Sequence, residues 1–461
     1  MLTTIKKKIS LPKEDKEKLL FIFRTFQQHN FECYLIGGSV RDLLLNLPVY
    51  DYDFATNAKP EEVLSLFKKV IPTGIKHGTV SVLLGKKTFE ITTYRADGKY
   101  LDGRRPEKIS FSKTLEEDVK RRDFTINGLA YDLQQEKIID YVEGLADLER
   151  KTIRTIGQAL NRFSEDGLRC YRACRLAAKL NFEIEEKTFA AISKTLSVAE
   201  KVSIERIRDE FKKILEVGKP SLGLEKLRLS GLLSLFLPEL SNCYKVDQNK
   251  YHLHDVYYHS VFSCDAAPKN FLHLRLAALL HDIGKPFAKQ QKDEGENTFY
   301  NHEVIGAKMT RKLMKRLKFS NEEIARVNNL VLNHMFHYTN DWTDGAVRRF
   351  MKKVGLENIQ DLFLLRLADR LGNGSREGLP QPIKILEERI NKIIEEENAI
   401  SIKDLKINGT ILMEKFNLKP GKIIGLVLKS LLEEVLDDPE KNEELFLLKK
   451  AEELLNLQEK N

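Results

Sequence analysis

The sequence has 461 residues, a formal net charge of +8 and 42% hydrophobic residues. This length exceeds that of one ordinary core, so we expect about two to four domains. The composition is that of a globular protein without a membrane helix, and its mild basic excess suits either a polyanionic partner or simple solubility.

The N-terminus and the cysteines indicate a cytoplasmic protein. The basic N-terminal stretch has one apolar cluster, at 19–23, which is too short for the hydrophobic region of a signal peptide. The five cysteines are scattered and odd in number, unlike a disulfide framework. Cys170 and Cys174 lie four residues apart, but no second pair accompanies them, so we expect no zinc site.

Residues 1–150 predict an α+β head domain. Residues 13–30 have the spacing of an amphipathic helix. Four later stretches have the composition of short strands bounded by turn residues: FECYLIGG, GTVSVLLG, KTFEITTYR and KIIDYV. Helical stretches separate them at 38–46, 60–69 and 115–122.

From about residue 150 the pattern is helical, and Pro220, Pro238 and Pro268 punctuate it. The helical segments are 164–180, 185–195, 203–216, 222–230, 256–265, 271–281, 302–317, 321–333, 357–371 and 379–398, followed by a helical tail. We therefore expect an α+β head (1–150), an all-α neck (151–235), an all-α body (236–400) and a tail (401–461).

The segment YLIGGSVRD in the head predicts an anion site. Gly37 and Gly38 would end a strand and begin a helix, where backbone N–H groups and the helix dipole attract a phosphate. Arg41 lies one turn into the helix, within reach of a phosphate oxygen, and Asp42 follows it. Taken alone, this pattern is more typical of a tight turn.

The segment YDYDFAT that follows strengthens the functional interpretation. Asp51 and Asp53 would share one face of a strand, and two such carboxylates repel each other unless a divalent cation lies between them. A Mg²⁺ pair bound in this way is typical of phosphoryl or nucleotidyl transfer. Glu90, on a predicted strand, is our candidate for a third carboxylate, and an exposed strand glutamate is a nearly equal alternative.

These motifs, followed in order by LEEDVKRRDFTINGLAYD and RFSEDGLRCYRACRLAAK, resemble the class II tRNA nucleotidyltransferases, or CCA-adding enzymes. Bacterial poly(A) polymerases belong to the same superfamily. The resemblance covers about the first half of the chain. It implies that the partners are tRNA, CTP and ATP, and that Asp51 and Asp53 are the metal ligands.

The resemblance also implies roles for several residues of the head. Gly38 and Arg41 would contact the triphosphate, and Arg122, Asp123 and Asn127 match the ribose-recognition motif of the family. Residues 96–106, ADGKYLDGRRP, match the mobile loop that accompanies the switch from C to A addition. This loop argues against an enzyme that adds only CC.

Asp166, Arg169, Arg172 and Arg175 recur every three residues on a predicted helix. One explanation is i, i+3 ion pairing on a solvated face. The other is base recognition, because a carboxylate beside a guanidinium complements the amino group and ring nitrogen of cytosine and adenine, and not uracil or guanine. We hypothesise that Asp166 and Arg169 select CTP and ATP without a template, and that Arg172 and Arg175 extend the positive face towards the triphosphate.

The second half carries a series of His and Asp residues in helix-like segments. A single buried His is usually structural, but an ordered set of six is not well explained in that way. The set resembles the HD superfamily of metal-dependent phosphohydrolases, and imidazole with carboxylate suits Mg, Mn, Ni or Fe. The six residues are His259, His281, Asp282, His302, His334 and Asp369. His252 and His254 lie outside the pattern.

In CCA-adding enzymes an HD domain at this position is associated with phosphatase and 2′,3′-cyclic phosphodiesterase activities, which the resemblance implies here. In the tail, Gly409, Pro420-Gly421 and Gly425 suggest two helices and a glycine turn that either grips a tRNA phosphate or forms an ordinary αα corner.

We therefore expect template-independent addition of CCA to the tRNA 3′ end. The nearest rival is a poly(A) polymerase or A-adding enzyme of the same superfamily. Rivals of other classes are an HD-type nucleotide phosphohydrolase with a vestigial head and a non-catalytic RNA-binding protein. The sequence leaves the oligomeric state open.

Overall fold

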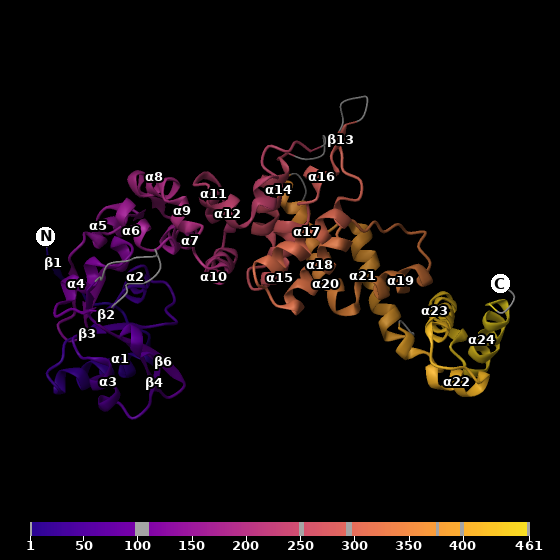
Figure 1. The fold of residues 1–461 in the computed structure, drawn as a ribbon, viewed down its shortest axis with the longest axis horizontal. Helices are drawn as coiled ribbons and strands as arrows, with labels where there is room; N and C mark the ends of the chain where they lie inside the picture. Colours follow the sequence, from indigo (N-terminus) through magenta and orange to yellow (C-terminus); the bar gives the residue numbers. More distant parts are fainter. Residues whose placement is uncertain are drawn as a thin grey trace. The chain divides into compact units, whose positions relative to one another are not determined.

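The computed structural model describes residues 2–96, 110–248, 253–291, 297–374, 378–396 and 401–458. The chain forms two compact units, Met1–Ser241 and Asn242–Asn461 (Figure 1). In the described ranges, no helix combines the length and the apolar character needed to cross a membrane. Most of the expected loop at 96–106, from residue 97 onwards, and His252 lie outside the described residues.

The first unit is built on an eight-stranded sheet of order β1-β10-β9-β2-β3-β6-β5-β4. Its strands are β1 (Thr3–Lys6), β2 (Cys33–Ile36), β3 (Asp53–Thr56), β4 (Val70–Gly74), β5 (Thr79–Leu84), β6 (Lys87–Thr93), β9 (Leu129–Asp132) and β10 (Lys137–Asp140). Within this sheet β3 and β6 are parallel, and the other neighbouring pairs are antiparallel. The four predicted strands are confirmed as β2, β5, β6 and β10.

Five helices accompany the sheet and eight continue into the neck within the described part of this unit. The helices of the head are α1 (Lys13–Gln28), α2 (Gly38–Leu44), α3 (Pro60–Leu66), α4 (Leu115–Lys120) and α5 (Gly144–Glu149). Those of the neck are α6 (Ala159–Glu165), α7 (Leu168–Leu180), α8 (Glu186–Lys194), α9 (Leu196–Ala199), α10 (Ile204–Leu215), α11 (Pro220–Leu229), α12 (Leu232–Phe236) and α13 (Pro238–Ser241). Short strands form two small pairs, β7 (Arg95–Ala96) with β8 (Ser110–Phe111) and β11 (Thr152–Ile153) with β12 (Glu183–Ile184). The second pair lies within 151–235 and corrects the expectation of an all-α neck.

The expectation of one continuous helix over 164–180 is wrong, because the chain breaks at Asp166 and Gly167 between α6 and α7. A Cβ atom at Gly167 would lie 2.6 Å from the carbonyl oxygen of Val198 and 2.7 Å from the Cα atom of Ala199. Only glycine fits this close approach to α9. Asp166 is extended, and its side chain accepts a hydrogen bond at 3.0 Å from the N–H of Leu168, the first residue of α7.

The described residues of the second unit are helical apart from one short strand pair, β13 (Gln290–Gln291) with β14 (Asn297–Thr298), which corrects the expectation of an all-α body. Its body helices are α14 (Val256–Ala266), α15 (Leu272–Leu280), α16 (Lys285–Ala288), α17 (His302–Arg316), α18 (Asn321–Asn333), α19 (Asp344–Val354), α20 (Leu356–Gly372) and α21 (Gln381–Glu395). Its tail helices are α22 (Gly409–Phe416), α23 (Lys422–Asp437) and α24 (Glu444–Gln458).

The tail helices pack around a core of their own that includes Leu412, Leu431 and Leu447, each fully buried. The tail joins the body through α19 and α23, where the Arg348 guanidinium donates to the carbonyl oxygen of Leu436 at 2.9 Å. Helix α19 has no counterpart among the predicted segments.

Candidate functional sites

Two carboxylates of the head lie side by side at one end of the parallel strand pair. Asp53, the first residue of β3, is in register with Glu90 of β6, and the Glu90 N–H donates to the carbonyl oxygen of Tyr52 at 3.1 Å. Asp51 is exposed just before the strand, whereas the Tyr52 side chain is buried. This alternation puts Asp51 and Asp53 on the same side, as predicted, although only Asp53 lies within the assigned strand.

The electrostatics of this edge favour a cation. Burial raises the pKa of Asp53 to about 6, and the charges of Glu90 and Asp51 act in the same direction. The Arg122 and Arg172 guanidinium groups oppose this rise. A divalent ion would relieve the mutual repulsion of the three carboxylates, and carboxylate oxygens are the ligands that Mg²⁺ prefers.

A partly buried ion pair supports this end of the strand. The Tyr52 hydroxyl donates to Asp15 of α1 at 3.0 Å, and the Lys87 ammonium lies 2.5 Å from the same carboxylate. Asp15 is 1% exposed. Lys87 begins β6, the strand that carries Glu90, so the pair ties α1 to both strands of the site.

The glycine turn lies directly against the carboxylates. Gly37 has a φ of 78°, which favours glycine, and a Cβ atom there would lie 3.1 Å from Nη1 of Arg122 and 3.7 Å from Oδ2 of Asp53. Helix α2 begins at Gly38. Arg41, expected to reach a phosphate, is 4% exposed and its guanidinium donates to Asp42 and Asn127.

The residues matched to ribose recognition form one network with these groups. Asn127 donates to Asp123 at 3.0 Å, and Arg172 of α7 donates to the other oxygen of Asp123 at 2.8 Å. Burial opposes ionisation of Asp123, but Arg172, Asn127 and the Phe124 N–H bring its pKa down to about 2. Arg122 is held by Asp118 at 3.0 Å. The network therefore presents fixed charges beside Asp53.

The structure does not pair Asp166 with Arg169. Arg206 of α10 donates to Asp166 at 3.0 Å, whereas Arg169 lies 2.5 Å from Glu165 and 3.3 Å from the carbonyl oxygen of Arg121. Because of the break at Gly167, Asp166 precedes the helix that carries Arg169. The Asp166 carboxylate is oriented by Arg206 and the Arg169 guanidinium by Glu165 and Arg121.

Arg175 lies 2.5 Å from Glu210 of α10, so it supports the packing of α7 on α10. Sequence reasoning missed Glu210 and Arg206, and it also missed Lys179, whose ammonium lies 2.8 Å from Asp42. These partners lie 35 to 137 residues away along the chain, and no local motif marks them.

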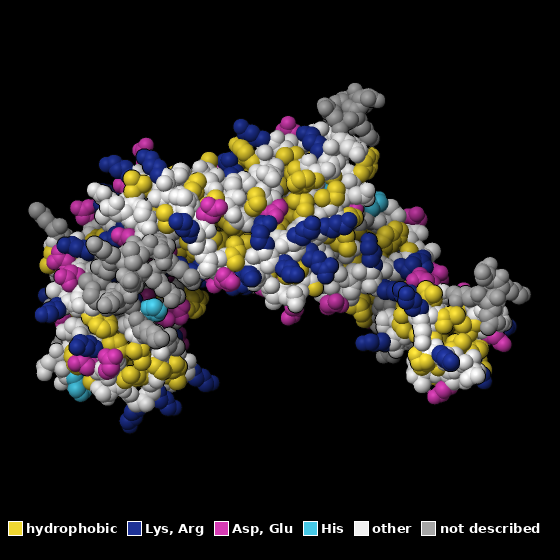
Figure 2. All heavy atoms as spheres, in the orientation of Figure 1, with side chains coloured by type: hydrophobic (Ala, Val, Ile, Leu, Met, Phe, Trp, Pro, Cys, Tyr) yellow, Lys and Arg dark blue, Asp and Glu magenta, His cyan; other side chains and the backbone are white. Residues whose placement is uncertain are grey.

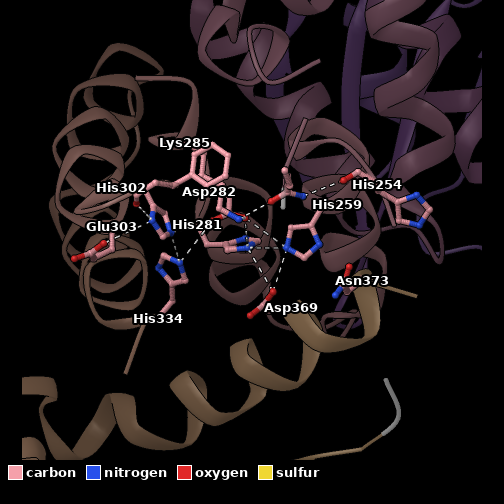
Figure 3. A network of polar contacts seen from close by, with 12 residues as sticks. His254, His259, His281, Asp282, Lys285, His302, Glu303, His334, Asp369 and Asn373 are labelled. Atoms are coloured by element: carbon pink, nitrogen blue, oxygen red, sulfur yellow. Dashed lines mark hydrogen bonds and ion pairs between the residues drawn. The ribbon is translucent and has the colours of Figure 1, made fainter. Parts of the chain in front are cut away.

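The six His and Asp residues of the body converge in one cluster (Figure 3). His281 directly follows α15, His302 begins α17, His334 directly follows α18, and His259 and Asp369 lie within α14 and α20. The four imidazoles and Asp282 are at most 4% exposed. A Cβ atom at Gly284 would clash with the backbone of α17, so this glycine lets Asp282 approach His302.

Two groups of donor atoms share Asp282: one contains His259 and His281, and the other His302 and His334. Asp369 Oδ1 lies 3.1 Å from His259 Nε2. Burial opposes ionisation of Asp282, but His281 and Lys285 hold its pKa well below the usual range. The side chains fit the predicted divalent-cation site, since imidazole nitrogens and carboxylate oxygens are ligands of Mn and Ni. His254 is in ring contact with Phe262, outside these two groups.

A cavity of about 400 Å³ opens beside the cluster. Three cationic side chains line it, Lys285, Arg366 and Arg370, together with Tyr300 and Met335. Tyr300 is 63% exposed and Met335 is 53% exposed. The cavity can therefore take an anionic group at the cluster and an apolar or aromatic group at its mouth. A cavity of about 720 Å³ in the first unit contains none of the predicted site residues in its lining.

The surface of the second unit is basic on the face shown in Figure 2, where Lys and Arg side chains gather over the body helices. Helix α17 carries exposed basic residues, among them Lys308, Arg311, Lys312 and Lys315. Their spacing of three and four residues puts them along one side of the helix.

Comparisons with known families agree with this architecture. The model of the poly(A) polymerase head domain matches residues 33–154, and the model described as a probable RNA and SrmB-binding site of polymerase A matches residues 181–244. The model of a putative tRNA nucleotidyltransferase domain 2 matches residues 300–451.

Individual relatives match over nearly the full length. The CCA-adding enzyme of Streptococcus suis is 34% identical over 442 residues, which are 95% of this chain and 96% of that protein. The CCA-adding enzyme of Lactococcus lactis is 34% identical over 435 residues, 93% of this chain and 95% of the relative. The crystal structure of the CCA-adding enzyme of Bacillus stearothermophilus in complex with CTP is similar with a TM-score of 0.74. It is 26% identical and covers 98% of this chain and 100% of that one.

Proposed function

The chain belongs to the family of CCA-adding enzymes, and we propose that it adds C, C and A to the 3′ end of tRNA at the carboxylates of the head. The observation that carries this assignment to particular residues is the register that puts Asp53 beside Glu90, next to Asp51 and Gly37. We place the protein in the cytoplasm, because five buried cysteines that form no disulfide suit a reducing compartment.

Asp51 and Asp53 would hold Mg²⁺, with Glu90 as the third carboxylate. When bound, the ions would lower the pKa of the terminal ribose hydroxyl and stabilise negative charge on the phosphates. The hydroxyl oxygen attacks the α-phosphorus of CTP or ATP and loses its proton, while the bond from that phosphorus to the pyrophosphate breaks. Gly37 allows the backbone to approach the carboxylates closely, so the triphosphate would lie along Gly37 and Gly38.

The nucleoside would lie between the head and the first neck helices. Asp123, Asn127 and Arg122 would fix the ribose, and Arg172 holds the Asp123 carboxylate in place. Asp166 and Arg169 would select the base. Arg206 and Glu165 orient these two side chains. The hydrogen-bonding groups that select the base without a template would therefore be in place before the nucleotide binds.

Binding of tRNA would depend mainly on phosphate contacts, because an RNA duplex is recognised by its shape. Exposed Lys and Arg side chains of the neck, body and tail would supply these contacts. The affinity for tRNA should therefore fall steeply with salt concentration.

The test is a reaction with tRNA that ends at its discriminator base and with all four NTPs present. Sequencing of the product 3′ ends should show CCA, with CC as an intermediate. Products that carry only A, or a run of A, would instead assign the rival poly(A) or A-adding activity. The Asp53→Asn variant serves as the inactive control.

We also propose that the body is an HD-type phosphohydrolase site, because all six expected ligands converge beside a cationic cavity. Lys285, Arg366 and Arg370 would bind a phosphate, and Tyr300 and Met335 would contact a base. Such a site could remove a terminal phosphate or a 2′,3′-cyclic phosphate that blocks addition. Incubation of 2′,3′-cyclic AMP with Mn²⁺ or Ni²⁺ tests this activity, and the His281→Asn variant should not hydrolyse it.

A further inference from the structure

Two cationic side chains of the neck helix α7 contact two carboxylates of the head. The Arg172 guanidinium donates to Oδ2 of Asp123 at 2.8 Å, and the Lys179 ammonium lies 2.8 Å from Oδ2 of Asp42. Arg172 and Lys179 are nearly two helical turns apart, so both lie on one side of α7, about 10 Å apart along its axis. Helix α7 is therefore attached to the head at two points.

Hydrogen bonds within the head join the same two carboxylates. Arg41 donates through Nε to Oδ1 of Asp42 at 2.8 Å and through Nη1 to Oδ1 of Asn127. Asn127 in turn donates through Nδ2 to Oδ1 of Asp123 at 3.0 Å. With the two contacts of α7, these bonds close a ring of side chains. Its members are Lys179, Asp42, Arg41, Asn127, Asp123 and Arg172.

The ring lies against the glycine turn where the triphosphate would bind. A Cβ atom at Gly38 would lie 3.3 Å from Nη2 of Arg41, and Arg41 is 4% exposed. The Arg41 guanidinium is thus packed at the start of α2. Because it is buried and bonded on both sides, the other members of the ring determine where its charge lies.

Lys179 determines the net charge of the ring. The ring contains three cationic groups and two carboxylates, which leaves one net positive charge. Asp42 would by itself compensate Arg41, since its Oδ1 atom lies 2.7 Å from Nη2 of Arg41. Lys179 compensates Asp42 through the other oxygen, and the Asp42 side chain is only 9% exposed. Without this ammonium the ring would be neutral and would attract a polyphosphate less strongly.

We propose that Lys179 is a positioning residue for the nucleoside triphosphate. By neutralising Asp42 and holding α7 on the head, it leaves the charge of Arg41 available to the phosphates. It acts through Asp42 and Arg41 and does not touch the substrate. CTP and ATP have the same phosphate groups, so both should depend on Lys179 equally. The proposal rests on the proposed addition of CCA at the head.

The test is steady-state kinetics of the full-length chain, with CTP on tRNA that ends at its discriminator base and ATP on tRNA that ends in CC. Lys179→Met should raise the KM for CTP and for ATP by about fivefold, a moderate effect because the Lys179 side chain is 39% exposed. The kcat and the KM for tRNA should stay within about twofold. The inhibition constant of pyrophosphate should rise by the same factor as the KM for CTP, because pyrophosphate has neither base nor ribose.

Two variants control for loss of a lysine as such. Lys179→Arg keeps the charge and should restore the KM for CTP. Lys226→Met is the matched control, because Lys226 also forms a partly buried ion pair in the neck, with Glu183 at 2.5 Å, outside the ring. It should leave the KM for CTP unchanged. Lys179→Gln replaces Lys179→Met if circular dichroism shows that the latter does not fold.

Asp42→Asn tests whether Lys179 acts through Asp42. In this background Lys179→Met should change the KM for CTP by less than about twofold, because the carboxylate that Lys179 neutralises is gone. A fivefold increase in this background as well would show that Lys179 acts by another route and would overturn the proposal.

Three other results of Lys179→Met would also overturn it. An unchanged KM for CTP, with or without a lower kcat, would leave Lys179 a structural role only. An increase in the KM for tRNA alone would make Lys179 a tRNA contact. A larger effect on CTP than on ATP would assign it to the base. Failure of the wild-type chain to add CCA would instead refute the proposed function, whereas normal addition with an unchanged KM in Lys179→Met would refute the role of Lys179 alone.

Discussion

Asp53 and Glu90 are direct neighbours across the parallel pair of β3 and β6, although 36 residues of sequence separate their positions. This relationship supports our proposal of Glu90 as the third carboxylate of the metal site. The parallel pairing could not be predicted from either strand alone, because both strands are short and carry no register signal.

We expect Asp53→Asn to reduce CMP incorporation into tRNA by about 10³-fold, as is typical for loss of a group that stabilises transition-state charge. Glu90→Gln should cause a loss of about 10-fold that high Mg²⁺ partly restores, since the remaining carboxylates still bind an ion. Incorporation of labelled CTP measures both. Glu61→Gln, on the exposed face of α3, is the control and should not change the rate. A Glu90→Gln enzyme with normal Mg²⁺ dependence would exclude Glu90 from the site.

The raised pKa of Asp53 predicts that the free energy of unfolding depends on pH. Its pKa of about 6 lies above the ordinary value of 3.8, mainly because of burial. Between about pH 4 and pH 6 the folded state therefore binds more protons than the unfolded chain, and the free energy of unfolding falls as the pH rises through this window. We expect Asp53→Asn to stabilise the protein by about 2 kcal/mol at pH 7.5 in EDTA, and by less at pH 5.

Urea unfolding at the two pH values measures this effect. Mg²⁺ should reduce the difference at pH 7.5, because the ion relieves the repulsion that the Asn side chain removes. An Asn variant that is equally stable, or less stable, at pH 7.5 would show that the Asp53 carboxylate is not strained in the folded head.

Local chemistry in the sequence identified much of the head site. Gly37, Gly38, Asp51 and Asp53 lie within one short segment, and the structure brings them together. The same holds for the six cluster residues of the body, whose order along the chain is characteristic. In both cases the residue types alone indicate binding of divalent cations.

The features of the fold that the sequence did not predict depend mostly on contacts between residues far apart along the chain. The break at Gly167 follows from contact with α9, although the Asp166-Gly167 pair is itself a turn signal that our helix prediction over 164–180 did not use. Helix α19 was not predicted, although its apolar residues have helical spacing and could have identified it. These residues are Val347, Phe350, Met351 and Val354. The pairing of Lys87 with Asp15 joins residues 72 apart and could not be inferred from either segment.

The ion pair of Lys87 with Asp15 gives a prediction about the stability of the head. Lys87→Met leaves the buried Asp15 carboxylate without its cation and should lower the free energy of unfolding by about 3 kcal/mol. The double variant Asp15→Leu with Lys87→Met removes both charges and should be less destabilised than Lys87→Met alone. Urea unfolding measures both variants, and Lys137→Met, at a partly exposed lysine whose ammonium donates to Gln135, is the control. Equal loss in the single and double variants would show that the charges are not coupled.

The base-selection hypothesis requires that Asp166 and Arg169 act as one edge. We expect Asp166→Arg with Arg169→Asp to shift incorporation from CTP and ATP towards UTP and GTP, because the exchange reverses donor and acceptor. The structure indicates that a third substitution is needed, because Arg206 would repel a new arginine at position 166. Adding Arg206→Glu should therefore increase incorporation of UTP. Nucleotide competition assays measure the ratio, and an unchanged preference for CTP in both variants would refute the hypothesis.

The two proposed activities reside in separate compact units, so single substitutions should separate them. His281→Asn removes a buried donor of the body cluster, and we expect it to reduce hydrolysis of 2′,3′-cyclic AMP by at least about 10²-fold while CCA addition stays within about twofold. Asp53→Asn should have the opposite pattern, and thermal unfolding verifies that both variants fold.

A tRNA that ends in a 2′,3′-cyclic phosphate tests the two activities in sequence, because the block must be removed before CCA can be added. The wild-type chain should remove the block and then add CCA, whereas His281→Asn should leave this tRNA unextended and still extend an unblocked one. Extension of the blocked tRNA by His281→Asn would mean that the cluster does not process tRNA ends.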